Sequence, residues 1–124
     1  MTDNRRAAAQ FIATLEGRDW DGWAALLHPD VVYELPQSRE RIRGRERYLQ
    51  FNRDYPSEWH LRAKVVLADQ TDGCVWFDWV VGDEQAEGVV FFSFDGEGLI
   101  TRVTDFWPEP YDPPSGREQL VERW

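Results

Sequence analysis

Two aspartates of the sequence stand in otherwise apolar stretches, where their carboxyl groups could do chemistry. Asp105 alternates with Val103 and Trp107, and Asp78 alternates with Trp76 and Val80. Alternate side chains of a strand share one face, so we expect Asp105 to share its face with apolar neighbours. A carboxyl group removed from water keeps its proton to higher pH and can act as a general acid or base near neutrality.

Each aspartate has two interpretations. Asp105 is either a catalytic acid or base, or a structural carboxylate paired with an arginine such as Arg102. Asp78 is a second site residue if its face of the strand points inward, and a solvated or interface residue if that face points outward. Other polar and aromatic side chains are candidates for substrate binding, although similar spacings also occur in ordinary cores. They are Tyr33, Tyr48, Asn52, Tyr55, Trp76 and Trp107.

Bulk composition excludes several classes of function. The net charge of -9 argues against a nucleic-acid partner, because phosphate binding needs a basic face. No apolar run is long enough to span a membrane, and a cytoplasmic location is the expectation. With one Cys and two His, we expect no metal site, and no cofactor is required. The 15% aromatic content, with seven Trp, indicates an apolar interior or cavity, or a subunit interface.

One basic run interrupts this acidic chain, and it has two interpretations. It either steers an anionic ligand toward the cavity or forms a solvated rim paired with Glu40 and Glu46. Its members are Arg39, Arg41, Arg43, Arg45 and Arg47.

The elements that must position these residues follow from periodicity. Three N-terminal helices are expected: one capped by Thr2 or Asp3 and running to about Glu16, a short one from Asp19 to Leu27, and one over 45–54. Strands are expected at 31–35, 59–68, 74–81, 87–94 and 99–107, with 36–43 a polar loop or irregular strand.

Residues 89–107 form the centre of this expected sheet. Asp95-Gly96-Glu97-Gly98 provides a tight turn between two apolar strands. A hairpin this apolar must be covered, so the sequence predicts an α+β fold in which three helices pack on a strongly curved antiparallel sheet. One domain accounts for residues 1–124.

The last segment, residues 108–124, is a Pro-rich C-terminal tail. We expect it to fold against the body or across a dimer, because its apolar side chains need burial. These are Tyr111, Leu120, Val121 and Trp124.

Several segments together resemble the NTF2-like superfamily, in its SnoaL-like and ketosteroid-isomerase-like branch. They are DWDGWAALLHPDVVYELP (19–36), IRGRE (42–46), FDGEGLI (94–100) and FW (106–107). The resemblance covers about residues 5 to 110 and implies a cone-shaped α+β barrel around a cavity. It does not specify a reaction, because this fold hosts many functions.

The resemblance also implies where catalytic groups would lie. At the three positions where ketosteroid isomerases carry their base and their two oxyanion-binding groups, this chain has Leu35, Phe11 and Val90, which cannot exchange protons. SnoaL-like polyketide cyclases use a late Asp, which Asp105 resembles. Epoxide-hydrolase-like members use a last-strand Asp together with an Arg-x-Asp. Asp78 resembles the latter Asp, but Trp76 stands in place of the Arg.

These observations lead to one preferred function and two alternatives. We expect a small, mainly apolar organic ligand, with Asp105 as general acid or base in an isomerase- or cyclase-type reaction without a cofactor. The alternatives are a non-catalytic ligand-binding or structural dimer, and an epoxide-hydrolase-like hydrolase that uses Asp105 and Asp78. Whether the chain is an enzyme stays open. A homodimer through the outer face of the sheet is expected.

Overall fold

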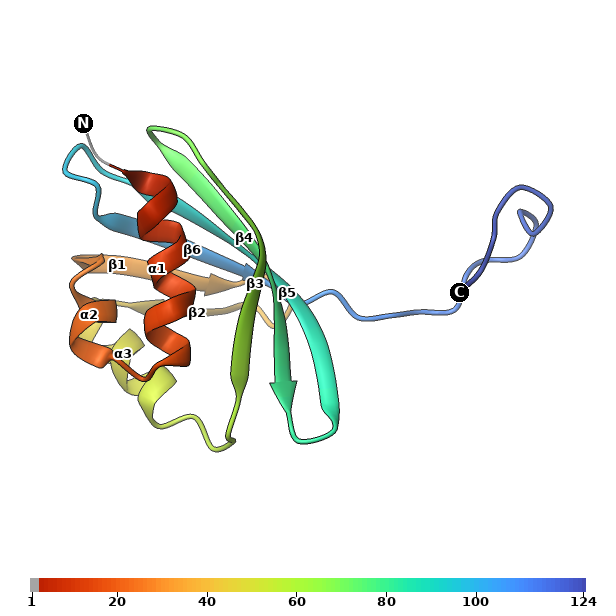
Figure 1. Ribbon diagram of the computed structural model, residues 1–124, viewed down its shortest axis with the longest axis horizontal. Helices are drawn as coiled ribbons and strands as arrows, with labels where there is room; N and C mark the ends of the chain where they lie inside the picture. The colour runs from red at the N-terminus through yellow and green to blue at the C-terminus, as the bar shows by residue number, and fades with distance from the viewer. Residues whose placement is uncertain (1–2) are drawn as a thin grey trace.

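The structure is a computed structural model that describes residues 3–124. Six strands form one sheet in the order β2-β1-β6-β5-β4-β3. The sheet is strongly bent and does not close, and the helices lie on its concave side (Figure 1). The elements are α1 (Asn4–Glu16), α2 (Trp20–Ala24), β1 (Leu27–Leu35), β2 (Glu40–Arg43), α3 (Arg45–Arg53), β3 (His60–Ala68), β4 (Asp72–Val81), β5 (Glu84–Phe94) and β6 (Ile100–Phe106).

The fold class and the three helices on a curved sheet are confirmed. One aspect of the sheet differs from the prediction. Strands β1 and β6 run parallel, whereas every other neighbouring pair is antiparallel. Strands β1 and β6 are the first and the last strand of the sequence. Local sequence patterns therefore carry no information on their pairing.

Helix α1 begins and ends where the sequence predicted. Asp3 is its N-cap, and the Oδ1 atom of Asp3 accepts a hydrogen bond from the backbone N–H of Arg6 at 2.9 Å. Thr2, the alternative cap, lies outside the described residues. The four residues of the predicted apolar stripe are all buried: Ala8, Phe11, Ile12 and Leu15.

The second helix is shorter than predicted. Helix α2 ends at Ala24, and Leu27, expected in the helix, is a fully buried residue at the start of β1. Pro29 lies within β1, where the pairing with β6 is interrupted between Leu27 and Val32, and such an interruption tolerates a residue without a backbone N–H. The expected polar loop contains the short edge strand β2.

The hairpin of β5 and β6 has the predicted turn. The Asp95 carboxylate accepts hydrogen bonds from the backbone N–H groups of Glu97 and Leu99, at 2.9 and 3.0 Å, and Gly98 adopts the left-handed region with φ of 82°. Register is irregular between Ser93 and Phe94, so strict alternation fails at the start of β6. From Val103 onward the alternation holds and leaves Asp105 on the inner face.

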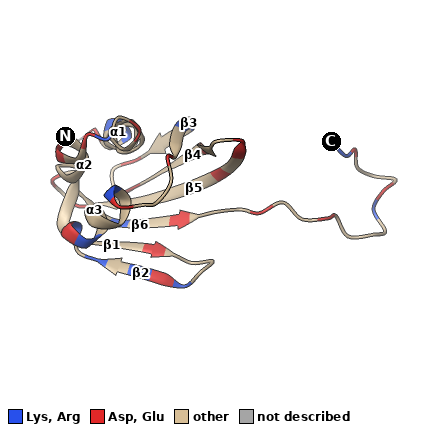
Figure 2. Cartoon of the chain, turned by 90° about the horizontal axis from the view of Figure 1, so that it is seen from below, with Lys and Arg blue, Asp and Glu red and all other residues tan. Residues whose placement is uncertain are grey.

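The C-terminal tail extends away from the body instead of packing on it (Figures 1 and 2). Tyr111, Leu120 and Trp124 are exposed almost completely, so the expectation that the tail folds against its own body is wrong. The physical reason is its run of prolines, which favours stiff, extended backbone. Packing across a dimer stays a prediction. No helix within residues 3–124 is long and apolar enough to cross a membrane.

Candidate functional site

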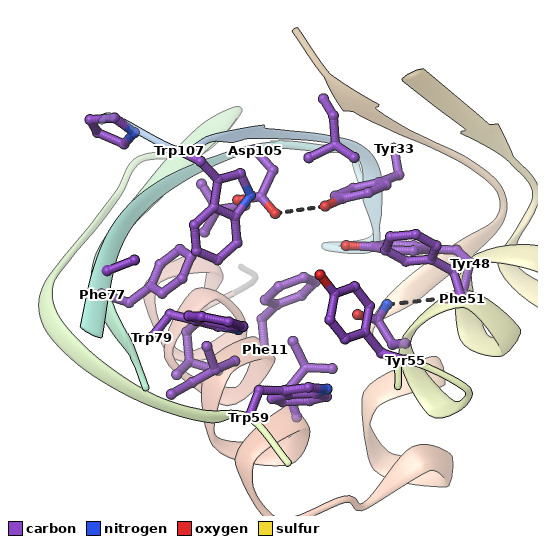
Figure 3. Close-up of a pocket in the computed structure, with 18 of the residues that line it drawn as sticks. Phe11, Tyr33, Tyr48, Phe51, Tyr55, Trp59, Phe77, Trp79, Asp105 and Trp107 are labelled. Atoms are coloured by element: carbon purple, nitrogen blue, oxygen red, sulfur yellow. Dashed lines mark hydrogen bonds between the residues drawn. The ribbon is translucent and has the colours of Figure 1, made fainter. Parts of the chain in front are cut away.

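A pocket of about 400 Å³ opens between the concave face of the sheet and helices α1 and α3 (Figure 3). This volume lies in the range of small-molecule sites. Most of its wall is aromatic or aliphatic. The lining residues are Phe11, Ile12, Leu15, Tyr33, Leu35, Tyr48, Phe51, Asn52, Tyr55, Trp59, Leu61, Phe77, Trp79, Ala86, Val90, Asp105, Trp107, Pro108 and Glu109.

Asp105 is the buried carboxyl group of this pocket. It lies near the end of β6, and its backbone pairs with Val90 of β5. The side chain is only 9% exposed, and its Oδ2 atom accepts a hydrogen bond of 2.7 Å from the hydroxyl of Tyr33. The other oxygen, Oδ1, is buried and has no hydrogen-bond partner among residues 3–124. Buried acceptors without a partner are uncommon in folded proteins, so this oxygen marks Asp105 as a candidate functional group.

Burial dominates the electrostatics of Asp105. Loss of water raises its pKa to about 6, although the hydrogen bond from Tyr33 and the nearby Trp107 indole both act to lower it. Burial and the Asp105 charge raise the pKa of Tyr33 far above its ordinary value, and the pKa of Tyr48 rises for the same two reasons. Both tyrosines therefore stay neutral phenols that can donate hydrogen bonds.

The two tyrosines are held by aromatic packing from three elements. Tyr33 of β1 stacks on Tyr48 of α3, with ring centroids 4.3 Å apart and planes at 17°. Tyr48 in turn packs edge-to-face with Trp23 of α2, with ring centroids 4.8 Å apart. The hydroxyl of Tyr48 points into the pocket (Figure 3). These contacts fix two phenol groups on the wall beside Asp105.

Three aromatic rings form the opposite wall. Phe77 and Trp79 of β4 each meet Trp107 nearly at right angles, with centroids 5.4 and 5.9 Å away. Trp107 is anchored by its backbone N–H, which donates to the side chain of Gln37. Gly88 of β5 makes room for Phe77, because a Cβ atom there would lie 2.4 Å from its ring.

Most of the residues that the sequence selected come together here. Asp105, Tyr33, Tyr48, Asn52, Tyr55 and Trp107 all line the pocket. Asn52 also braces α3, since its amide donates to the backbone carbonyl of Tyr48 at 3.1 Å. The sequence left open whether Trp59 and Trp79 belong to a cavity wall or to a dimer interface, and both line the pocket. Phe77, which the sequence did not select, also completes the wall.

Asp78 and Trp76 do not line the pocket. Strand β4 turns Val75, Phe77 and Trp79 inward and leaves its alternate residues on the outer face. There Lys64 lies 3.7 Å from the Asp78 carboxylate and 4.1 Å from the centre of the Trp76 ring. The sequence does contain an indication of this orientation. The face of β4 that carries the charged Asp78 is the less apolar of its two faces, and the less apolar face is expected to point outward.

The arginines are engaged outside the pocket. Arg102, one expected partner of Asp105, pairs with Glu34, as does Arg41 at 2.6 Å. Thus Asp105 forms no ion pair within residues 3–124, and the basic run contributes no lining residue to the described pocket. Within the same residues, no three His, Cys, Asp or Glu side chains gather to hold a metal ion.

The positions that correspond to the polar groups of ketosteroid isomerases do face the pocket. Phe11, Leu35 and Val90 all line it. Because Asp105 pairs across the sheet with Val90, its carboxyl group lies one strand away from one of those positions.

Comparison with known proteins identifies relatives of this chain. The profile of the SnoaL-like domain family matches residues 8–103. A protein from Kribbella flavida DSM 17836, provisionally named a ketosteroid isomerase, is 51% identical, with a TM-score of 0.94 over 98% of this chain and 89% of that one.

Two further solved structures are similar at 25% identity. One is an LEH-like epoxide hydrolase from M. tuberculosis, with a TM-score of 0.69 over 85% of this chain and 82% of that chain. The other, from Xanthomonas campestris, is provisionally named a polyketide cyclase, with a TM-score of 0.65 over 86% of this chain and 93% of that chain. Comparison with curated protein sequences gives no significant match.

Proposed function

Because the chain belongs to the SnoaL-like domain family, we propose that it binds a small, mainly apolar organic molecule and transfers a proton on it with Asp105. The observation that carries this proposal is the buried Asp105 carboxyl group in the pocket wall, whose Oδ1 atom has no hydrogen-bond partner within the described residues. A pKa of about 6 supports it, because proton transfer is most effective when the pKa of the catalytic group lies near the working pH.

The surrounding groups suit an isomerase- or cyclase-type reaction. Asp105 removes a proton from carbon through Oδ1 while Tyr33 holds Oδ2, and the protonated carboxyl returns the proton at another position. The Tyr48 hydroxyl, which points into the pocket, donates a hydrogen bond to the substrate oxygen on which negative charge develops (Figure 3). Aromatic walls exclude water, which strengthens both interactions.

Proton transfer can be measured before the natural substrate is known. Small cyclic ketones and enones are incubated with the protein in D₂O, and NMR follows exchange of the protons next to the carbonyl. We expect the wild-type protein to accelerate exchange, and the Asp105→Asn variant to lose about a hundredfold or more of that acceleration. Asp78→Asn is the matched control, because it removes a carboxylate from the outer face. Equal exchange by Asp105→Asn and wild type would contradict the proposal.

Two alternatives remain distinguishable in the same experiments. A non-catalytic ligand-binding dimer would bind the ketones, seen as shifts of Trp resonances, without accelerating exchange. An epoxide-hydrolase-like reaction is less well supported, because Asp78 and Asp105 lie on opposite faces of the sheet. It would appear as diol formation from epoxides that depends on both aspartates.

A further inference from the structure

We propose that the pocket selects a ligand with a positive charge, a protonated or quaternary amine on an apolar body, with the charge held beside Asp105. This inference rests on the proposed function, because it uses the same pocket and the same carboxyl group. It adds the chemical class of the ligand, which neither the family nor the fold specifies.

The charge of the residues that line the pocket is the first step of the argument for a cationic ligand. Among the described residues that line the pocket, the only charged side chains are Asp105 and Glu109, and both are acidic. No Lys, Arg or His of residues 3–124 is among them. A bound anion would thus meet two carboxyl groups and no cation, whereas a bound cation would meet a partner. The net charge of -9 also favours the approach of cations over anions.

One oxygen of Asp105 has no hydrogen-bond partner among the described residues, and this is the second step of the argument. At a pH above its pKa, Asp105 is a buried carboxylate. Within the described residues, its negative charge is stabilised only by the hydrogen bond from Tyr33 and a weaker interaction with Trp107. The Oδ1 atom lacks a partner within the described chain. A neutral apolar ligand would remove the remaining water from this carboxylate and leave it unpaired, which is costly. A positive charge beside the carboxylate would offset this cost, so the same burial would favour binding of a cation.

The aromatic rings carry the third step. Phe77 and Trp79 each stand nearly at right angles to Trp107 on one side of Asp105, and the stacked Tyr33–Tyr48 pair lies on the other side (Figure 3). Aromatic faces attract cations, and cages of several rings recognise quaternary ammonium groups. A carboxylate within such a cage combines both forms of attraction in one place.

Three probes of the same shape test the charge preference. They are phenyltrimethylammonium, its uncharged isostere tert-butylbenzene, and the anion benzenesulfonate, each titrated while NMR follows the indole N–H signals. Near pH 8 we expect the ammonium probe to bind at least about tenfold more tightly than the isostere, and the anion not to bind. Equal affinity of the first two would overturn this inference and leave the proposed apolar site intact.

The Asp105→Asn variant and the pH dependence identify the anchor. We expect the ammonium preference to disappear in this variant and, in the wild-type protein, to weaken toward pH 5 as Asp105 becomes protonated. The other titratable groups that face Asp105 are Tyr33 from β1, Tyr48 from α3, Tyr55 just beyond α3, and Glu109 at the start of the tail. The raised pKa values of Tyr33 and Tyr48 keep both phenols neutral over this interval.

Asp78→Asn is the control for the variant. It removes the same charge from the protein but lies on the outer face of the sheet, so it should keep the preference. An ammonium preference that survives in Asp105→Asn would contradict the assigned anchor. Failure of all three probes to bind would overturn the inference, whereas the proposed proton transfer is judged separately by exchange in D₂O.

Discussion

At the scale of single residues, Asp105 links function to stability. Its pKa is about 6 in the folded protein, against an ordinary value of 3.8. The folded state therefore binds more protons than the unfolded state between these values, and the free energy of unfolding falls as pH rises through this window. We expect a loss of about 3 kcal/mol from this group across the window, complete above the folded pKa.

The Asp105→Asn variant should not show this loss. Its amide oxygen can still accept the hydrogen bond from Tyr33, so we expect equal stability below about pH 4 and a more stable variant at neutral pH. Urea unfolding at a series of pH values checks this, with Asp78→Asn as a control that should keep the wild-type slope. A variant destabilised at neutral pH by about 3–5 kcal/mol would instead identify a structural carboxylate.

A second prediction concerns the phenol that holds Asp105. The Tyr33 hydroxyl stabilises the charged carboxylate and so lowers its pKa. Tyr33→Phe should raise the pKa of Asp105 by about one to two units, the value of a hydrogen bond to a charged group. NMR titration of the ¹³C-labelled carboxyl group measures the shift. Tyr48→Phe, which leaves that hydrogen bond in place, should change the pKa little, and an equal shift in both variants would contradict the assigned role.

The sequence could reveal some of these residues but not their partners. Asp105 was identifiable because its alternate neighbours are apolar, and the structure places it in the pocket. Its hydrogen bond with Tyr33 joins residues 72 positions apart and depends on the parallel pairing of β1 with β6. For Asp78 the sequence contains only a weak indication, because both faces of β4 carry aromatic residues and they differ mainly in the charge of Asp78 itself.

At the scale of elements, periodicity predicted long, strongly patterned segments best. Helix α1 and strands β3 to β6 lie close to their expected ranges, because the helix has a regular apolar stripe and the strands are rich in aliphatic and aromatic residues between turn residues. The ends of α2 and β1 were wrong, because Trp20, Trp23 and Leu27 fit a helical stripe whether or not the helix continues. Strand β2 is short and polar and lies at a sheet edge, so its sequence resembles a loop.

The close contact between β5 and β4 supplies a prediction at this scale. A Cβ atom on Gly88 would lie 2.4 Å from the ring of Phe77, which is buried and packed against Trp107. Gly88→Ala should displace that ring into the pocket and destabilise the protein by about 1–3 kcal/mol. Urea unfolding gives the stability, and binding of tert-butylbenzene reports the narrowed pocket.

The matched control for this substitution lies in the turn before β6. A Cβ atom on Gly96 would meet no heavy atom within 4 Å, so Gly96→Ala should leave both stability and binding nearly unchanged. Equal effects of the two substitutions would show that Phe77 is not held by this contact.

At the scale of the whole molecule, the outer face of the sheet carries an apolar patch beside its charged residues. Two adjacent rows of paired residues cross β3 to β6 there: Val65, Trp76, Val89 and Phe106 in one, and Leu67, Cys74, Phe91 and Thr104 in the other. Leu67 is 59% exposed and Phe91 is 47% exposed. Contiguous apolar patches of this kind mark interaction sites.

We predict that two copies of the chain pair through this outer face. Light scattering at micromolar concentration should give a dimer, and Phe91→Lys should convert it to a monomer, because truncation or charging of a central aromatic anchor costs about 2 kcal/mol or more. The pocket lies on the concave side, so binding of tert-butylbenzene should survive in this variant.

Tyr111→Lys makes the same chemical change on the exposed tail. If the face alone forms the interface, this control stays dimeric; if it too dissociates, the tail packs across the dimer. A wild-type protein that remains monomeric would contradict the prediction, and the exposed rings of β5 and β6 would then need a different partner.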